Sequence, residues 1–317
     1  MIKKGSSLSN LQFKCQWVMV TTLTFLIMSA CKKNTQHPSS PTLGEVNILA
    51  DISLQNILSQ EEDIFERNYK YAQVNITYET EHQILKSFLQ DSAEQIICAR
   101  KLNDKETRFL EERKLIPRHY ILGTTAIAFI NNLSDQDTSY TYEEIHEIIR
   151  TGRKDIQAVV IEHAQSGIAR MILNDLGMEQ FPSHVYAKGS KEEVINYVRQ
   201  NQGSLGLIDW SSISDSDDPQ ATALLKDIRL LAISRPKDSI QYGFVHPYQY
   251  NLQDKRYPYT RDIYYISRSG KSDLGLGFAS FIAGEIGQKI ILKAGLLPAY
   301  QSERWIELIN RDVRVEK

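Results

Sequence analysis

The chain has 317 residues and a formal net charge of −2, with 42% hydrophobic and 24% charged residues. These values are ordinary for a globular protein, and the charge balance excludes the basic footprint of a nucleic-acid-binding domain. Two of the three cysteines lie within the first 31 residues, which excludes a disulfide framework in the rest of the chain.

The first 31 residues have the order of a secretory signal peptide. Lys3 and Lys4 lead a polar segment, residues 16–30 are mostly apolar, and small residues precede Cys31. The apolar run is shorter than the roughly 20 residues of a transmembrane helix. Because the small-small-Cys ending resembles the bacterial lipobox, we expect residues 1–30 to be a lipoprotein signal peptide and Cys31 to carry the lipid. The alternative is an N-terminal anchor helix with an incidental cysteine.

Beyond this segment, residues 31–44 are polar, contain two prolines and indicate a flexible tether. Short apolar runs then alternate with helical patterns. The predicted strands cover 46–50, 74–78, 96–99, 126–130, 158–161 and 205–208. Capping boxes begin predicted helices at Ser59, Thr141 and Ser190, and a further helix runs from Ser166 to about Leu176, with Gly177 as its end. This alternation favours an α/β fold with mainly parallel strand pairing.

Several kinds of chemistry have no support in the sequence. Neither glycine-rich phosphate loop is present, and Arg150 stands where a zinc-protease helix beginning at His146 would need its second histidine. The acidic segment 214–219 lacks the glycine and glutamate of an EF-hand and indicates a solvated turn. Cys98 lies in an apolar run and is expected in the core. We therefore expect that the chain is not an enzyme and that it has no cofactor or metal site.

Polar loops follow three of the predicted strands, at 51–53, 79–81 and 164–167. Ligands of open α/β sheets bind at such strand ends, and helix N-termini favour anions. Ser166 with Gly167 is the most specific pair, because a hydroxyl precedes a residue that allows close approach to the backbone. The alternative for Ser53 and Ser166 is simple helix capping.

Several segments, in this order, resemble the PstS-like phosphate-binding family of ABC-transporter substrate-binding lipoproteins, in the form common in Bacteroidetes. They are 126–132 with the helix 142–152, then 203–208, 257–261 and 287–295. The resemblance implies a type II periplasmic-binding-protein fold, with two α/β lobes joined by two crossover strands and hinge closure around a ligand. It implies one lobe from 45–126 plus 236–317 and another from 127–235.

The resemblance also implies a site between the lobes. Ser53, Thr80, Ser166 and Gly167 fall on positions that match the family's phosphate pocket, and Asp51 lies in the same loop as Ser53. The pocket departs from the family at Glu162, Ile168 and Ala99, which replace an arginine, a threonine and an aspartate. Arg100 and Arg170 are the candidate compensating cations, although both could equally be surface residues or pair with glutamates.

The leading interpretation is a monomeric, lipid-anchored solute-binding protein of the cell envelope, facing the periplasm. It would bind phosphate or a related small oxyanion and deliver it to an inner-membrane ABC permease. One alternative is a degenerate family member that acts as a sensory or protein-interaction lipoprotein. Another is a binder of an organic ligand whose amine pairs with Glu162.

Overall fold

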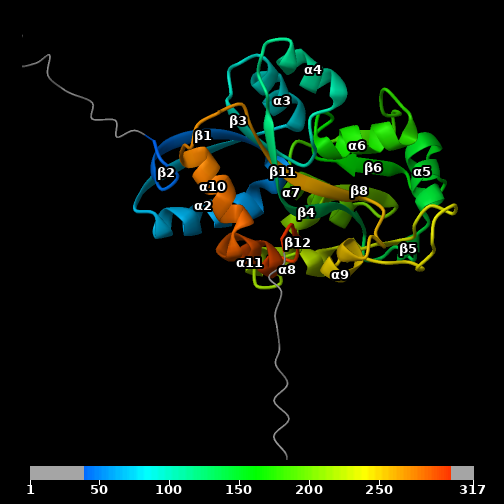
Figure 1. Cartoon of the computed structure of the whole chain (residues 1–317). Coiled ribbons are helices and arrows are strands. Elements are labelled where there is room, and N and C mark those ends of the chain that lie inside the picture. The colour runs from blue at the N-terminus through cyan, green and yellow to red at the C-terminus, as the bar shows by residue number, and fades with distance from the viewer. Residues whose placement is uncertain (1–38, 301–317) are drawn as a thin grey trace, which may run out of the picture. The chain divides into compact units, whose positions relative to one another are not determined.

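Strands and helices alternate along residues 39–300, the part of the chain that this computed structural model describes (Figure 1). The strands are β1 (Leu43–Asp51), β2 (Tyr71–Glu79), β3 (Gln95–Cys98), β4 (Arg118–Asn131), β5 (Ser139–Tyr140), β6 (Ala158–Ile161), β7 (Val185–Ala187), β8 (Ser204–Asp209), β9 (Arg229–Leu230), β10 (Ala232–Ile233), β11 (Thr260–Ser267) and β12 (Leu297–Pro298). The helices are α2 (Gln55–Asn68), α3 (Glu81–Leu89), α4 (Asp104–Glu111), α5 (Tyr142–Thr151), α6 (Gly167–Leu176), α7 (Lys191–Gln200), α8 (Pro219–Asp227), α9 (Gln249–Gln253), α10 (Leu274–Ala283) and α11 (Glu285–Lys293), with the short 3-10 helices η1 (Ile52–Leu54) and η2 (Trp210–Ser212).

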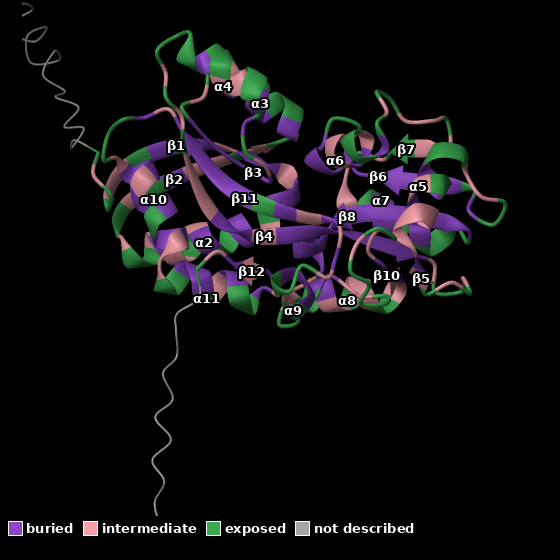
Figure 2. Cartoon of the chain, turned by 45° about the vertical axis from the view of Figure 1, so that its right-hand side comes forward, coloured by how far each residue is buried: buried purple, intermediate pink, exposed green. Residues whose placement is uncertain are grey.

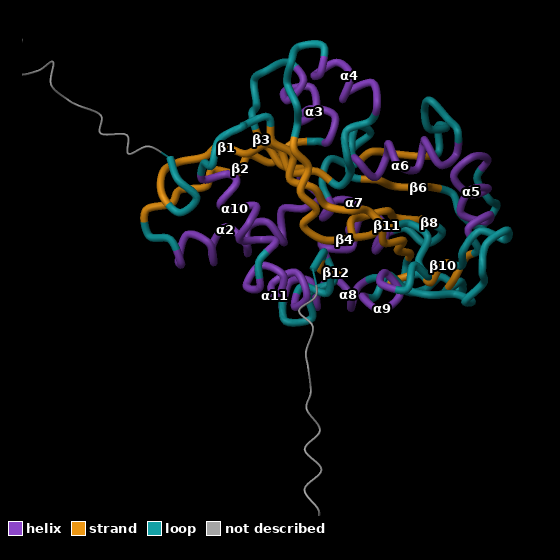
Figure 3. The backbone as a smooth tube through the Cα atoms, in the orientation of Figure 1, coloured by secondary structure: helices purple, strands orange, loops and turns teal. Residues whose placement is uncertain are grey.

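The main sheet has the strand order β2-β1-β3-β11-β4-β8-β6-β7. Pairing is parallel between β2, β1 and β3 and between β8, β6 and β7, and antiparallel where β11 and β4 lie in the middle. Strand β4 pairs with β11 up to Ala126 and with β8 from Ile127 onward. Figure 3 shows the strands continuing through the centre of this part of the chain.

The predicted fold class is confirmed: two α/β lobes share the sheet, and β4 and β11 are the crossover strands between them. The first lobe contains β1, β2, β3, α2, α3, α4, α10 and α11, and the second contains β6, β7, β8, α5, α6 and α7 (Figure 1). Parallel pairing holds within each lobe, and most of the antiparallel pairing comes from the two strands that join them.

An apolar core runs through both lobes. Every residue of β6 and β8 is buried, as expected for strands that are covered on both faces (Figure 2). The larger core cluster contains residues of both lobes, and a smaller one lies under α3 and α4. Cys98 belongs to the smaller cluster and is fully buried, which confirms its prediction as a core residue.

Most predicted helix starts are confirmed. Thr141 and Glu144 form a complete capping box on α5, Ser190 caps α7, and Gly177 ends α6 with φ of 64°. The prediction at Ser59 is wrong, because the chain enters α2 directly from η1 and the helix begins at Gln55. The Ser59 hydroxyl instead donates to the Asn56 carbonyl within the helix (3.2 Å).

The N-terminal predictions fall mostly outside the described residues. Cys31, the predicted signal peptide and most of the predicted tether precede residue 39. Strand β1 begins at Leu43, so the last part of the predicted tether already pairs with β2. None of the helices within residues 39–300 is long and apolar enough to cross a membrane.

Candidate functional site between the two lobes

The ends of β1, β2, β6 and β8 bring their polar loops together where the two lobes face each other. Helix α3 of the first lobe begins after Thr80, and helix α6 of the second begins after Ser166. The two helix starts are in contact, because the His82 amide donates a hydrogen bond to the Gln165 carbonyl (3.3 Å). Each start presents backbone N–H groups and a partial positive charge, so the junction favours negative groups.

Arg261 of β11 lies at the centre of this junction and is only 2% exposed. Its Nη1 donates to Asp209 Oδ2 (2.6 Å) at the end of β8, and its Nη2 donates to Asp51 Oδ2 (3.1 Å) at the end of β1. Nη1 also reaches the Ser53 hydroxyl (3.3 Å). Arg261 therefore ties carboxylates of both lobes to a crossover strand.

A second group of charges centres on Glu81, the first residue of α3. Its Oε1 accepts from the Nε of Arg100 (3.2 Å) in the first lobe and from the Nε of Arg170 in the second. Its Oε2 lies 3.4 Å from Nη2 of Arg170. Arg100 is also held by Glu106, through two hydrogen bonds of 2.7 Å. A single carboxylate thus receives one guanidinium from each lobe.

Gly167 allows these groups to lie close to the start of α6. A Cβ atom there would be 2.4 Å from Nη2 of Arg261 and 2.5 Å from Oε2 of Glu81. Any side chain would force these groups apart, since real Cβ contacts stay beyond about 3 Å. The predicted role of Gly167, close approach to the backbone, is therefore fulfilled by the protein's own side chains.

Burial and neighbouring charges shift the pKa values of Asp51, Glu81 and Arg261. Burial raises the pKa of Asp51 more than Arg261 lowers it, and Glu81 adds to the rise. Burial also acts to raise the pKa of Glu81, but Arg170 and Arg261 outweigh it and hold that pKa below the usual range. Burial opposes the charge of Arg261, yet Asp209 and Asp51 keep its pKa above the ordinary value. Glu81 is therefore a carboxylate held by cations.

Glu162, at the position where the family resemblance implies an arginine, does not join Arg100 and Arg170. It lines a separate cavity of about 300 Å³ with Lys191. Its Oε1 has no hydrogen-bond partner among the described residues. Burial, then the charges of Asp209 and Asp51, raise the pKa of Glu162 to about 8. It is therefore largely neutral near pH 7 rather than a fixed negative charge facing an anion.

The predicted site residues come together, but most are already engaged. Ser53 accepts from Arg261, and Ser166 caps α6 by accepting from the Ala169 amide (3.1 Å). The Thr80 side chain makes no capping hydrogen bond. Arg100 and Arg170 both pair with Glu81, which is the glutamate-paired alternative in the sequence analysis.

Three residues of the site were not predicted: Glu81, Asp209 and Arg261. Each has a sequence signal, since Glu81 closes the polar loop 79–81, Asp209 follows the predicted strand 205–208 and ends β8, and Arg261 closes the segment 257–261. What the sequence does not give is their pairing, because Arg261 is 52 residues from Asp209 and 210 from Asp51.

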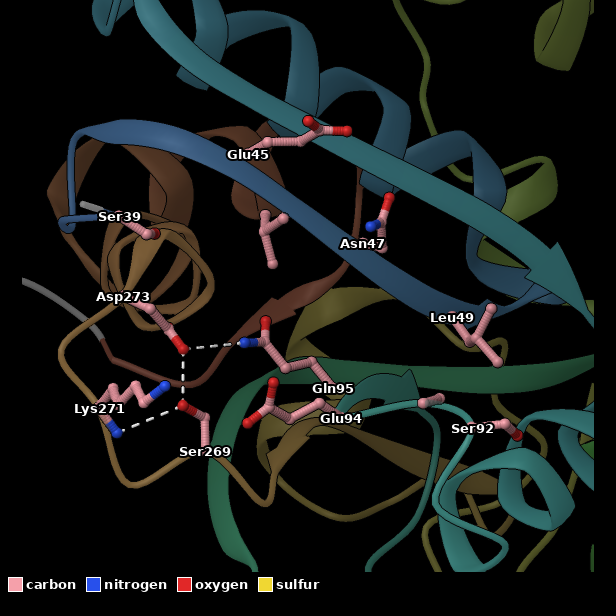
Figure 4. A pocket seen from close by; sticks show the side chains of 12 residues that line it. Ser39, Glu45, Asn47, Leu49, Ser92, Glu94, Gln95, Ser269, Lys271 and Asp273 are labelled. Carbon is pink, nitrogen blue, oxygen red and sulfur yellow. Dashed lines mark hydrogen bonds between the residues drawn. The ribbon is translucent and has the colours of Figure 1, made fainter. Parts of the chain in front are cut away.

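Two larger cavities also adjoin the folded elements. One, of about 810 Å³, opens between α3 and α6 and is lined by Glu81, Arg100, Ser166 and Arg170. Another, of about 450 Å³, lies in the first lobe beside β1 and β3 (Figure 4). In the latter, Asp273 accepts from Gln95 (3.2 Å) and Ser269 (2.7 Å) and caps α10, so its polar groups serve the fold.

Comparison with known proteins gives a family and a fold. A family model described as a PBP superfamily domain matches residues 35–285. No curated protein sequence matches the chain significantly. A protein from Clostridium perfringens, assigned as a phosphate ABC transporter substrate-binding protein and solved with bound phosphate, is 18% identical over 81% of this chain and 100% of its own, with a TM-score of 0.65.

Two further structures show how widely the fold is used. An ABC-type phosphate transport receptor from Vibrio cholerae is 16% identical over 80% of this chain and 100% of its own, with a TM-score of 0.61. Full-length OxyR from Pseudomonas aeruginosa is 10% identical over 86% of this chain and 83% of its own, with a TM-score of 0.50. At these identities the likeness shows the fold alone, and function must be argued from the site.

Proposed function

The chain belongs to the PBP superfamily, and from that premise we propose that it is a solute-binding protein for phosphate or a related small oxyanion. The ligand is held between the lobes, which close around it. One observation carries the proposal: Arg100 and Arg170, one from each lobe, already converge on a small oxyanion group, the carboxylate of Glu81. Guanidinium groups bind carboxylates and phosphates through the same paired hydrogen bonds.

In this function Arg100 and Arg170 hold the anion, and the N-terminal amides at Ser166 and Gly167 complete the shell. Thr80, whose side chain makes no capping hydrogen bond, adds a hydroxyl. Asp51 and Ser53 act one step away, by holding Arg261. The lobes comprise 45–126 plus 236–317 and 127–235, which the change of partners along β4 at residue 126 supports.

Titration calorimetry of the purified full chain with inorganic phosphate, sulfate and molybdate tests the binding. We expect saturable heat for at least one anion. Arg170→Gln should weaken that binding at least tenfold. Arg153→Gln, which removes two ion pairs within the second lobe and does not line the cavity at Glu81, should not. Absence of heat at millimolar anion would remove the proposal.

The cellular setting follows from the N-terminal sequence. We propose that the mature chain begins at a lipidated Cys31, is anchored to a membrane facing the periplasm, and delivers its ligand to an ABC permease as a monomer. Cys31→Ser should abolish incorporation of radiolabelled palmitate and leave the protein in the unprocessed form. Labelling that survives the substitution contradicts this part of the proposal.

The second candidate function is a sensory or protein-interaction lipoprotein without a transported solute. The observation that favours it is that Asp51, Glu81, Asp209 and Arg261 fill the junction between the lobes with bonded side chains. A chain that binds none of the three anions in calorimetry would support this candidate over the first.

A further inference from the structure

The Glu81 carboxylate stands in the place that the proposed function gives to the anion. It belongs to the first lobe, yet one of its two guanidinium partners, Arg170, belongs to the second. Its Oε2 lies against the start of α6, as the 2.5 Å approach to a Cβ on Gly167 shows. Helix starts of this kind stabilise negative groups. A bound oxyanion and the Glu81 side chain would therefore compete for the same donors.

We propose that Glu81 is a built-in competitor that latches the two lobes together through Arg170 and must release it before an oxyanion binds. The latching part rests on the geometry alone, and the competing part rests on the proposed anion-binding function. Glu81 is thereby the residue that sets the affinity of the site. A ligand binds only if it holds Arg100 and Arg170 better than this carboxylate does.

The latch has a route by which it can open. The side chain of Arg170 is 34% exposed, whereas that of Glu81 is 2% exposed. Arg170 and Glu81 both line the 810 Å³ cavity between α3 and α6, so Arg170 can turn into that cavity without unfolding either helix. Arg100 stays in place meanwhile, because Glu106 of its own lobe holds it by two hydrogen bonds. Arg170 is therefore the moving partner and Arg100 the fixed one.

Other charges facing Glu81 maintain its negative form. Arg261 approaches it from β11, and the carboxyl of Asp51 faces it from the end of β1. Since the pKa of Glu81 is held below its usual range, the latch keeps its charge at neutral pH. Glutamine at this position has the same shape but no charge, so Glu81→Gln removes the competitor while preserving the packing.

Hydrogen exchange of the full chain, measured by mass spectrometry without added anion, tests the latch. We expect Glu81→Gln and Arg170→Gln each to speed exchange at least tenfold in peptides covering 80–89 and 166–176. The His82 amide, which bonds to Gln165 across the junction, is the reporter. Glu106→Gln is the matched control: it removes a carboxylate from Arg100 within one lobe, while the glutamine oxygen can still accept from the Asn103 amide in the capping box of α4, so exchange in 80–89 and 166–176 should stay unchanged.

Phosphate titration of the same proteins tests the competition. Glu81→Gln should bind phosphate at least tenfold more tightly than the unaltered chain, whereas Arg170→Gln should bind it more weakly. Two variants that both open the latch thus move affinity in opposite directions, which a general loss of structure would not produce. Parallel titrations with acetate and sulfate show whether the tighter binding of Glu81→Gln extends to other oxyanions.

The outcomes separate the two ideas. Unchanged exchange in both Glu81→Gln and Arg170→Gln overturns the latch. Faster exchange with equal phosphate affinity in the unaltered chain and Glu81→Gln overturns the competition. Faster exchange without phosphate binding to any of the proteins supports the latch and overturns the proposed anion-binding function. Should Glu81→Gln fail to fold, Arg170→Gln, altered at a partly exposed side chain, carries the exchange test.

Discussion

Glu162 places a carboxyl group in the interior without a bonded cation. Burial, with Asp209 and Asp51, raises its pKa to about 8 from an ordinary 4.5. Below pH 4.5 the folded and unfolded chains both hold this proton. Between pH 4.5 and about 8 the folded chain keeps the proton and the unfolded chain has lost it. The stability that comes from this proton is therefore lost, and the free energy of unfolding falls, as pH rises through that window.

Glu162→Gln should therefore become more stable, relative to the unaltered chain, as pH rises. The gain in unfolding free energy is at most about 1.4 kcal/mol per pH unit within that window. Urea unfolding at pH 5 and pH 8 measures it. Glu285→Gln is the control: Lys289 lowers the pKa of exposed Glu285, so the contribution of Glu285 is lost only below its ordinary pKa of 4.5, and this variant should keep the same relative stability at pH 5 and pH 8. If Glu162→Gln raised the free energy of unfolding equally at both pH values, the raised pKa of Glu162 would be contradicted.

The role of a site residue can be predicted from the sequence when its partner lies within a few residues along the chain. Gly177 was predicted as the end of α6, and capping by Ser166 was the alternative to its predicted ligand contact, because capping is decided within a few residues. Arg100 and Arg170 were predicted as cations but not with Glu81 as their common partner. That partner is 89 residues from Arg170, and only the folded sheet brings the two together.

At the scale of the element, the start of α6 depends on a glycine. Gly167→Ala would gain little from helix propensity, because Gly167 is the first residue of α6, and its Cβ would overlap Arg261 and Glu81. Overpacking of this kind typically costs about 1–3 kcal/mol. We expect Gly167→Ala to lower the unfolding free energy and to speed exchange in α6. Gly270→Ala, where no atom lies within 4 Å of the added Cβ, should change stability by no more than about 0.5 kcal/mol.

Helices α3 and α5 provide a matched pair of threonine caps. Thr141 accepts a hydrogen bond from the Glu144 amide, whereas the Thr80 side chain makes no capping bond. Thr141→Ala should lower the unfolding free energy by about 1 kcal/mol, and Thr80→Ala by clearly less. Urea unfolding of both variants measures the difference. Equal losses would mean that Thr80 caps α3 after all.

Elements were predicted better than their boundaries and partners. All six predicted strands coincide with observed strands, and only Ala99 extends past the end of its strand, β3, because apolar runs between helical patterns identify covered sheet positions directly. The start of α2 was missed, since η1 leads into it and removes the usual serine cap. The family resemblance implied two crossover strands, but the antiparallel pairing of β4 with β11 and β8 was not predicted, as periodicity does not specify which strands pair.

At the scale of the whole molecule, the lobes are joined by an apolar core, by the Glu81–Arg170 pair and by the buried ion network of Arg261. The core continues through β4, so hydrophobic burial alone does not separate the lobes. Arg261 adds a polar connection, because it binds an acid at the end of β1 and another at the end of β8. Buried ion pairs of this kind contribute little net stability when intact, but leave a large penalty when one partner is removed.

Arg261→Met should therefore destabilise the whole molecule by about 3–5 kcal/mol at neutral pH, because Asp51 and Asp209 are left buried without a counter-charge. Adding Asp51→Asn and Asp209→Asn should recover most of that loss, since no unpaired charge remains. Urea unfolding of the single and triple variants measures both steps. A single variant as stable as the unaltered chain would show that these acids are protonated or hydrated in the folded state. A triple variant no better than the single one would instead place the loss in the packing of the Arg261 side chain, which fills the space where the two lobes meet.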